Sequence, residues 1–174
     1  TIYLRLIGIP LPIQCIYYLY PMVKAGQYNK LKVVRKADFG FYLDDGAEGI
    51  LLPNRFVPKN LNIGDEIEVL VYHDSEDRLI ATTQKPLGIV GDIVKLKTVS
   101  TTPQGAFLDW GLMKDLFVAK SQQLTGMRTQ GEYLIKIYRD EKTGRVAASE
   151  KFDSSLSNDQ LTVKVLDEVD LIVY

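Results

Sequence analysis

An internal repeat of about 65 residues is the feature that most constrains what this chain can fold into. The segment from Phe39 to Asp44 reads Phe-Gly-Phe-Tyr-Leu-Asp, and the segment from Gly105 to Asp109 reads Gly-Ala-Phe-Leu-Asp. Further matching pairs follow at separations of 65 to 67 residues: Gly40 with Gly105, Gly64 with Gly131, Tyr72 with Tyr138, Asp74 with Asp140 and Arg78 with Arg145. A chain of 174 residues has room for two such units, so the repeat predicts one small domain at 22–85 and another at 86–150.

Each unit has the pattern of a small all-β barrel. In the first unit, short apolar stretches bounded by turn residues predict strands at 30–35, 40–43, 49–52, 66–72 and 78–82. A tight turn is expected at Ala37-Asp38, a hairpin at Asp45-Gly46 and a single helical turn at 53–57. Five short strands in so few residues are typical of a Greek-key barrel of the OB type. The predicted fold class is therefore all-β, with tandem five-stranded OB-fold barrels.

The composition excludes several classes of enzyme. The chain has one cysteine, Cys15, and one histidine, His73, so an intrachain disulfide, a Cys- or His-rich metal site and a Ser-His-Asp triad are not expected. The phosphate-binding pattern Gly-x-x-x-x-Gly-Lys-Ser/Thr is also absent. We expect no catalysis, no cofactor and no bound metal. The net charge of −1 predicts only a modest attraction to phosphate, centred on the second unit, where ten Lys and Arg face seven Asp and Glu.

The two ends of the chain do not follow the repeat. Residues 1–21 are apolar, but Arg5, Pro10, Pro12 and Gln14 interrupt the run, which argues against a membrane helix. We expect a non-native or mis-annotated extension with Met22 as the true start; a membrane or export segment, an extra strand and a partner-binding arm remain alternatives. Residues 151–160 are typical of a polar linker. Residues 161–174 predict the start of a further domain of the same type, truncated.

These motifs resemble the S1 RNA-binding domain, a five-stranded OB barrel that binds single-stranded RNA. The resemblance rests on the segments Phe39 to Asp44 and Gly49 to Asn54, and on the hairpin pair Asp74 and Arg78. Two such units, the linker and the third start are similar to the layout of the bacterial conserved virulence factor B family. In that family, consecutive S1-type domains precede a winged helix, which here would lie beyond Tyr174.

The resemblance implies an RNA face in the first unit. S1 domains use two aromatic residues three positions apart, a histidine on the next strand, and an aspartate and an arginine on the last hairpin. Phe39 and Tyr42 match the aromatic positions, and Asp74 and Arg78 match the hairpin pair. Leu52 occupies the histidine position, so one contact is expected to be lost.

In the second unit the resemblance implies a weaker RNA face. Gln104 replaces the first aromatic residue, Phe107 keeps the second, and Val118 occupies the histidine position. Asp140 and Arg145 remain. Basic residues near these positions are candidates for phosphate contacts: Arg55, Lys120, Lys32, Lys36 and Lys97.

Each assignment has an ordinary structural alternative. Aromatic side chains on strands most often pack in a core, and successive side chains point to opposite faces. We therefore expect Phe41 in the core and Phe39 and Tyr42 at the surface, with both readings open for Phe107. The pair Asp74 and Arg78 is equally consistent with a hairpin salt bridge. We expect His73 to be a solvated turn residue, and Trp110 to pack in a hairpin.

The function expected from the sequence is binding of single-stranded RNA in the cytoplasm, by aromatic stacking and basic contacts. The role would be post-transcriptional or translational regulation. One alternative is a degenerate scaffold that docks a protein partner such as the ribosome or an RNA-processing enzyme, and another is DNA binding through the missing winged helix. A membrane-attached protein would rest on residues 1–21 alone.

Overall fold

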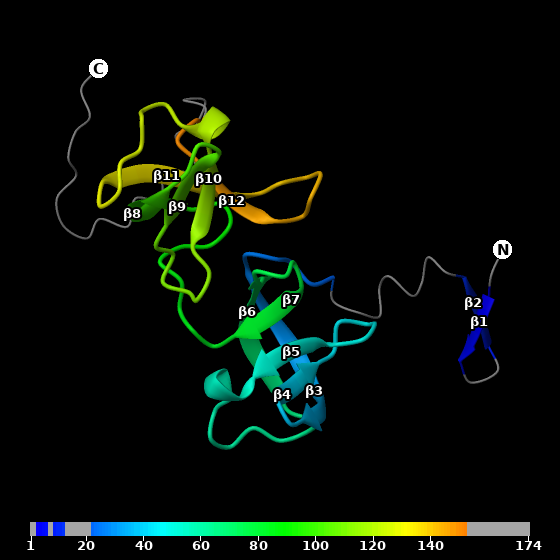
Figure 1. The fold of residues 1–174 in the computed structure, drawn as a ribbon. Coiled ribbons are helices and arrows are strands. Elements are labelled where there is room, and N and C mark those ends of the chain that lie inside the picture. The colour runs from blue at the N-terminus through cyan, green and yellow to red at the C-terminus, as the bar shows by residue number, and fades with distance from the viewer. Residues whose placement is uncertain (1–2, 7–8, 13–21, 153–174) are drawn as a thin grey trace.

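A computed structural model describes residues 3–6, 9–12 and 22–152, which form two β-barrels and a separate β-hairpin (Figure 1). The first barrel comprises β3 (Tyr28–Ala37), β4 (Gly40–Leu43), β5 (Ile50–Pro53), β6 (Glu66–His73) and β7 (Leu79–Thr82), with the 3-10 turn η1 (Asn54–Phe56). The second comprises β8 (Ile93–Thr101), β9 (Gly105–Leu108), β10 (Leu116–Ala119), β11 (Glu132–Arg139) and β12 (Val146–Ser149), with η2 (Lys120–Gln122). The hairpin pairs β1 (Tyr3–Leu6) with β2 (Ile9–Pro12). The expected all-β fold of tandem five-stranded barrels is confirmed.

The two barrels share one strand order. In the first, the order β3-β4-β5-β7-β6 closes on itself, and the closing step is a parallel contact at which Leu51 of β5 pairs with Ile80 of β7. In the second, the hydrogen-bonded order is β10-β9-β8-β11-β12. There β10 and β12 lie side by side and complete the barrel without a paired ladder.

A β-bulge lies at the same place in each repeat. The register of β3 against β4 shifts between Val33 and Arg35, and the register of β8 against β9 shifts between Thr98 and Ser100. A bulge adds one residue to one strand and increases its local twist, which lets a long strand curve around a small barrel. The bulges therefore explain how β3 and β8 each reach two neighbouring strands.

Each barrel has its own apolar core. The first is built from nine buried residues: Leu31, Val33, Phe41, Leu43, Ile50, Leu52, Val69, Val71 and Ala81. The core of the second also takes in Tyr72 from the first barrel, which is 4% exposed. Strand β6 is buried on both faces from Val69 to Tyr72, and the second barrel covers Tyr72 on the outer side. Phe41 is in the core, as expected.

One predicted turn is wrong by a residue. Strand β3 continues to Ala37, and the tight turn falls at Asp38-Phe39 instead of Ala37-Asp38. Phe39 is therefore in the turn that precedes β4 and not on the strand itself. The predicted single helical turn at 53–57 is present as η1. Most of the predicted linker and the whole of the predicted further domain lie outside the described residues. No helix in the part of the chain that the structure describes is long and apolar enough to cross a membrane.

Two glycines at matching positions are required by the neighbouring strand. A Cβ atom at Gly40 would overlap the carbonyl oxygen of Leu52, and one at Gly105 would overlap that of Val118. A glycine within a strand often marks the close approach of a ligand or of another backbone segment. The structure shows that the adjacent strand backbone makes this approach.

We expect Gly40→Ala to lower the free energy of unfolding by about 1–3 kcal/mol, because the clash is with backbone that cannot move without breaking the barrel. Urea denaturation followed by circular dichroism measures the change. Gly126→Ala is the matched control, because a Cβ there meets nothing within 4 Å. Equal stability of the two variants would show that β4 and β5 can separate at little cost.

Candidate nucleic-acid interface

A stripe of outward-facing side chains crosses the first barrel. Strand register places Arg35 opposite Tyr42, Tyr42 opposite Leu51, Leu51 opposite Ile80, and Ile80 opposite Tyr72. Residues that are opposite one another on adjacent strands share a face of the sheet. The flanking residues of β4 and β5 point into the core, so this stripe is on the outside of the barrel.

The two aromatic residues expected on the RNA face lie at one end of this stripe. The guanidinium carbon of Arg35 is 3.8 Å from the centroid of the Tyr42 ring, which fixes the ring on the barrel surface. The Phe39 side chain is 74% exposed in the adjoining turn. Asn54 holds that turn, because its backbone N–H donates to the carbonyl of Phe39 and its side chain donates to that of Asp38.

Three cations of the first barrel have no acidic partner among the described residues. Arg35, Lys36 and Arg55 form none of the ion pairs found among the described residues. Each lies over an aromatic ring instead, at 5.6 Å from the Phe41 centroid for Lys36 and 5.3 Å from the Phe56 centroid for Arg55. Their charges are therefore available to phosphate groups.

The hairpin between β6 and β7 holds Arg78 in a defined position. The Asp74 carboxylate accepts hydrogen bonds from the Nε and Nη2 of Arg78 and from the backbone N–H groups of Glu76 and Arg78. Partial burial acts to raise the pKa of Asp74, but these hydrogen bonds outweigh it and hold that pKa below its ordinary value. The Asp74 hydrogen bond raises the pKa of Arg78, with smaller contributions from Glu76 and the nearby Tyr42. Asp74 thus orients Arg78 beside Tyr42.

The second barrel has the same stripe with different residues. Ser100 is opposite Phe107, and Phe107 is opposite Phe117, with 5.1 Å between the two ring centroids. Gln104 takes the turn position of Phe39, and its carbonyl accepts from the backbone N–H of Lys120. Lys120 is exposed at the start of η2.

The two residues at the position of the S1 histidine point into the barrel cores. Leu52 and Val118 are both fully buried, each in the core of its barrel. Neither side chain reaches the outer face, because the alternation of β5 and β10 turns Leu51 and Phe117 outward instead. Neither Leu52 nor Val118 therefore supplies a contact on the outer face.

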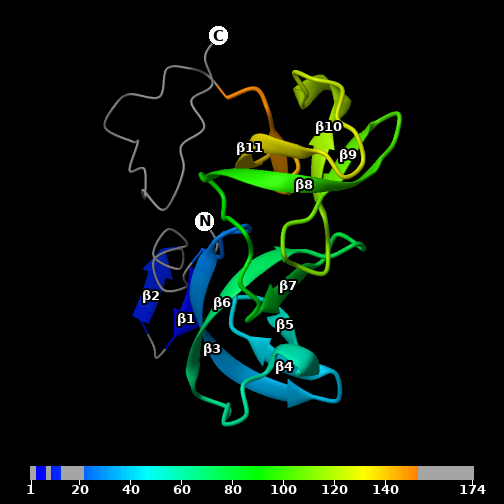
Figure 2. The same ribbon diagram turned by 90° about the vertical axis from the view of Figure 1, so that its left-hand side faces the viewer.

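An aromatic contact joins the two barrels. The loop between β9 and β10 extends from the second barrel to the β6–β7 hairpin of the first (Figures 1 and 2). At its start, Trp110 is 2% exposed and packs edge-on against Tyr72, with 6.2 Å between centroids and planes at 83°. The indole N–H donates to the carbonyl of Gly88 at 2.7 Å, and Lys114 donates to the carbonyl of Asp74. Trp110 is a packing residue, but it packs between barrels as well as within a hairpin.

An ion pair adds to the joint at a strained residue. Arg145 pairs with Asp77 of the first barrel and not with Asp140, its counterpart in the repeat. Asp77 has a φ of 63°, which is a left-handed conformation. Gly144 is at the corresponding position of the second hairpin and has a φ of 71°. Aspartate tolerates this region better than most residues. The two repeats therefore differ at the point where they meet.

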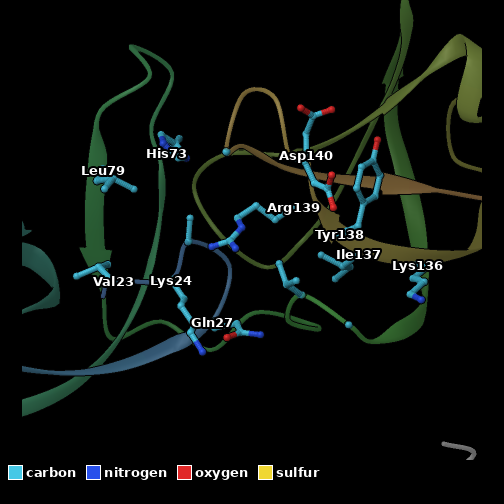
Figure 3. Close-up of a pocket in the computed structure, with 15 residues that line it drawn as sticks. Val23, Lys24, Gln27, His73, Leu79, Lys136, Ile137, Tyr138, Arg139 and Asp140 are labelled. Carbon is cyan, nitrogen blue, oxygen red and sulfur yellow. The ribbon is translucent and has the colours of Figure 1, made fainter. Parts of the chain in front are cut away.

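Two cavities flank the joint. The first, which we call the Arg139 cavity, has a volume of about 760 Å³, with His73 and Leu79 on the first barrel facing Ile137, Tyr138 and Arg139 on the second (Figure 3). The other, which we call the Phe117 cavity, has a volume of about 790 Å³. It brings together Phe107 and Arg145, two of the residues expected to bind RNA, whereas Phe39, Tyr42, Asp74, Arg78 and Arg55 belong to the first barrel.

The sequence interpretation missed three contributors to this surface. Arg35 contacts Tyr42, Phe117 contacts Phe107, and Tyr138 lines both cavities. Phe117 carries a signal that could have found it, because it alternates with the buried Leu116 and Val118. Among the described residues, no group of three or more His, Cys, Asp or Glu side chains is placed to hold a metal ion.

The fold and the outer-face residues place this chain among proteins built from OB-type barrels. Residues 25–84, which include all five strands of the first barrel, match the S1 domain family.

Two known proteins resemble longer parts of the chain. It is 35% identical over 98 residues to the protein YitL of Bacillus subtilis, a match that covers 56% of this chain and 33% of YitL. Its fold is similar to a multidomain protein with nucleic acid binding domains from Streptococcus pneumoniae, with a TM-score of 0.64 and 15% identity, over 74% of this chain and 46% of that one. The chain thus spans a third of the length of YitL. Its similarity to the Streptococcus pneumoniae protein is a similarity of fold.

We expect aromatic packing, and not the ion pair, to hold the barrels together. Trp110→Ala should lower the free energy of unfolding by about 3–5 kcal/mol, because it removes a buried ring and leaves a cavity. Asp77→Asn should change it by less than about 1 kcal/mol, since both partners of the ion pair are half exposed. Urea denaturation followed by circular dichroism compares them. A loss from Asp77→Asn as large as that from Trp110→Ala would contradict this order.

We also expect the stability to fall as the pH drops from about 7.5 to about 5.5. Burial lowers the pKa of His73, and the nearby Lys114 and Arg145 lower it further, against a smaller opposing effect of Asp74. The unfolded chain therefore binds a proton at His73 more readily than the folded one, so acid favours unfolding. Because this is the only histidine, His73→Gln should flatten the dependence in that window. An unchanged slope in His73→Gln would show that another group titrates there.

Proposed function

We propose that this chain binds single-stranded RNA on the outer face of its first barrel. The observation that carries the proposal is the Phe39 ring, which is 74% exposed in the turn before β4, the strand whose Tyr42 lies under Arg35 on the outer face. A ring that keeps most of its surface open to solvent can stack on a base. Arg35, Lys36 and Arg55 of the same barrel form no ion pair among the described residues, so they can contact phosphate groups.

The chemistry of this surface suits unpaired bases. An aromatic ring on a sheet stacks on a base face of any identity, and single strands expose those faces whereas duplexes do not. Each stack contributes about 1–3 kcal/mol. Two stacks at Phe39 and Tyr42, with a few phosphate contacts from Arg35, Lys36 and Arg55, correspond to a dissociation constant in the micromolar range after the costs of association.

The comparisons support this proposal at a coarser level. The first barrel matches the S1 domain family, and the Streptococcus pneumoniae protein of similar fold is described as having nucleic acid binding domains. We propose further that the chain is part of a larger cytoplasmic protein with the layout of the virulence factor B family. Its role would be to regulate translation or RNA turnover by binding, without catalysis of its own.

The double substitution Phe39→Ala and Tyr42→Ala should weaken binding of a short unstructured RNA by at least about tenfold, because both stacking surfaces are lost. Fluorescence anisotropy of the labelled RNA measures the affinity. Phe39→Ala alone should not alter the fold, because that ring is 74% exposed. Leu124→Ala is the matched control, an equally exposed apolar residue on the second barrel, at 66%.

The salt dependence provides an independent check. If Arg35, Lys36 and Arg55 each contact a phosphate, the logarithm of the affinity should fall with the logarithm of salt concentration at a slope of about −2. Binding that ignores both aromatic substitutions and salt would overturn the proposal. It would favour a surface that docks a protein partner instead.

A further inference from the structure

The Phe117 cavity has the size and composition of a ligand pocket. Its volume of about 790 Å³ falls within the range of about 300–1,000 Å³ that is typical of small-molecule sites, which often form between domains. Aromatic side chains from both barrels line it: Tyr72, Trp110, Phe107, Phe117 and Tyr138. No single barrel could form it, so it exists only because the joint holds the two together.

The cavity continues the surface that we propose binds RNA. The stripe that begins at Tyr42 crosses Leu51 and Ile80 and ends at Tyr72, which is part of the cavity lining. Neighbouring strands lie about 4.8 Å apart, so these three steps cover roughly 14 Å. A strand of RNA that lies along the first barrel therefore leads to the entrance of the cavity.

The rings and the carboxylates in the cavity suit one kind of occupant. Phe107 and Phe117 offer faces on which a base can stack. Asp77, Asp115 and Asp140 also line the cavity, and a carboxylate accepts hydrogen bonds but cannot donate them. Among the described residues, every hydrogen bond that the Asp140 carboxylate accepts reaches Oδ1, which leaves its Oδ2 available. These acceptors match the exocyclic amino groups of adenine, cytosine and guanine, which uracil lacks.

The cations of the cavity are already engaged by the protein. Lys114 donates to the carbonyl of Asp74, and Arg145 pairs with Asp77. The phosphate of a bound nucleotide would therefore find its cationic partner outside the cavity. Lys120 follows Ala119 of the cavity lining and is exposed, so it is placed to contact the phosphate of a nucleotide whose base is inside.

We propose that the Phe117 cavity is a composite pocket, formed by both barrels, for a single amino-bearing nucleobase stacked on Phe117 and Phe107. The base belongs either to an RNA strand bound along the first barrel or to a free mononucleotide. With RNA as the source, the inference rests on the function proposed above. The pocket would then add base selectivity to a surface that stacks bases without regard to their identity.

The experiment uses the only tryptophan of the chain as a reporter. Trp110 lines the cavity, so a base that enters changes its fluorescence. The full chain is titrated with oligo(A), oligo(C) and oligo(U), and separately with AMP, CMP and UMP, with correction for absorbance. Anisotropy of labelled RNA records total binding in parallel. We expect Trp110 emission to change with the same midpoint as the anisotropy, more strongly for A and C than for U.

Three variants isolate the pocket from the first barrel. Phe117→Leu removes a stacking face but keeps an apolar side chain, and should weaken the Trp110 response at least about fivefold. Ala147 lines the cavity opposite Tyr138, so Ala147→Leu fills space there without removing a ring and should block entry. Leu124→Ala, at an exposed residue of the second barrel outside the cavity lining, is the control and should bind like the native chain. Urea denaturation confirms that each variant is folded, and Ala147→Leu tests the pocket even if Phe117→Leu unfolds.

The outcomes separate the pocket from the RNA-binding function. RNA binding that depends on Phe39 and Tyr42, with unchanged Trp110 emission and no effect of Phe117→Leu or Ala147→Leu, would overturn the pocket and leave the proposed function. A Phe117-dependent response to mononucleotides without RNA binding would support the pocket with a free nucleotide as its ligand and overturn the proposed function. An equal response to A, C and U would overturn the preference for amino-bearing bases. No response of either kind would overturn both.

Discussion

The edge-on contact between Trp110 and Tyr72 is the interaction on which the rest of this structure depends. Domains of about 65 residues bury only roughly 60% of their unfolded surface and are marginally stable alone. Tyr72 adds to the core of the second barrel, and the covered outer side of β6 adds to the first, so each barrel completes the other. The hydrogen bond from the indole to Gly88 also ties the connecting segment to the same point. At this joint the outer faces of the two barrels meet and line the two cavities together.

The two repeats have diverged into different surfaces around this joint. The first barrel exposes its turn aromatic residue, Phe39, whereas the second has Gln104 at that position and places its aromatic pair against the cavity between the barrels. The hairpin arginines follow the same division. Arg78 is held by its own hairpin beside the open surface, whereas Arg145 reaches across to Asp77. A duplicated domain that kept two identical surfaces would have needed neither the left-handed Asp77 nor the change of partner at Arg145.

The alternation of apolar residues and the matching glycines were sufficient to predict the fold, because both report on local backbone requirements. Gly40 and Gly105 are forced by the neighbouring strand in each barrel, and that constraint is visible in the sequence as a repeat. The site was harder to predict. The longer β3 moved the turn to Asp38-Phe39, and Arg35 was assigned no role because its contact with Tyr42 depends on that register. Burial of Leu52 could not be inferred from the resemblance, which aligns positions but does not fix the face of a strand. The cavities depend on how two barrels pack, which no local pattern encodes.

The charge of the chain limits which mode of RNA binding the proposed function can use. With a net charge of −1, the protein cannot rely on the general attraction to phosphate that dominates in strongly basic proteins, and that attraction does not distinguish single strands from duplexes. Stacking makes this distinction, because the base faces in a duplex are already covered by their neighbours. In the proposed mode, Phe39 and Tyr42 would make such contacts, supported by the cations of the first barrel that form no ion pair among the described residues. A binding mode that depends on aromatic stacking more than on charge would select single strands, because only single strands expose base faces. In the pocket proposed above, the carboxylate acceptors would add a preference among the bases.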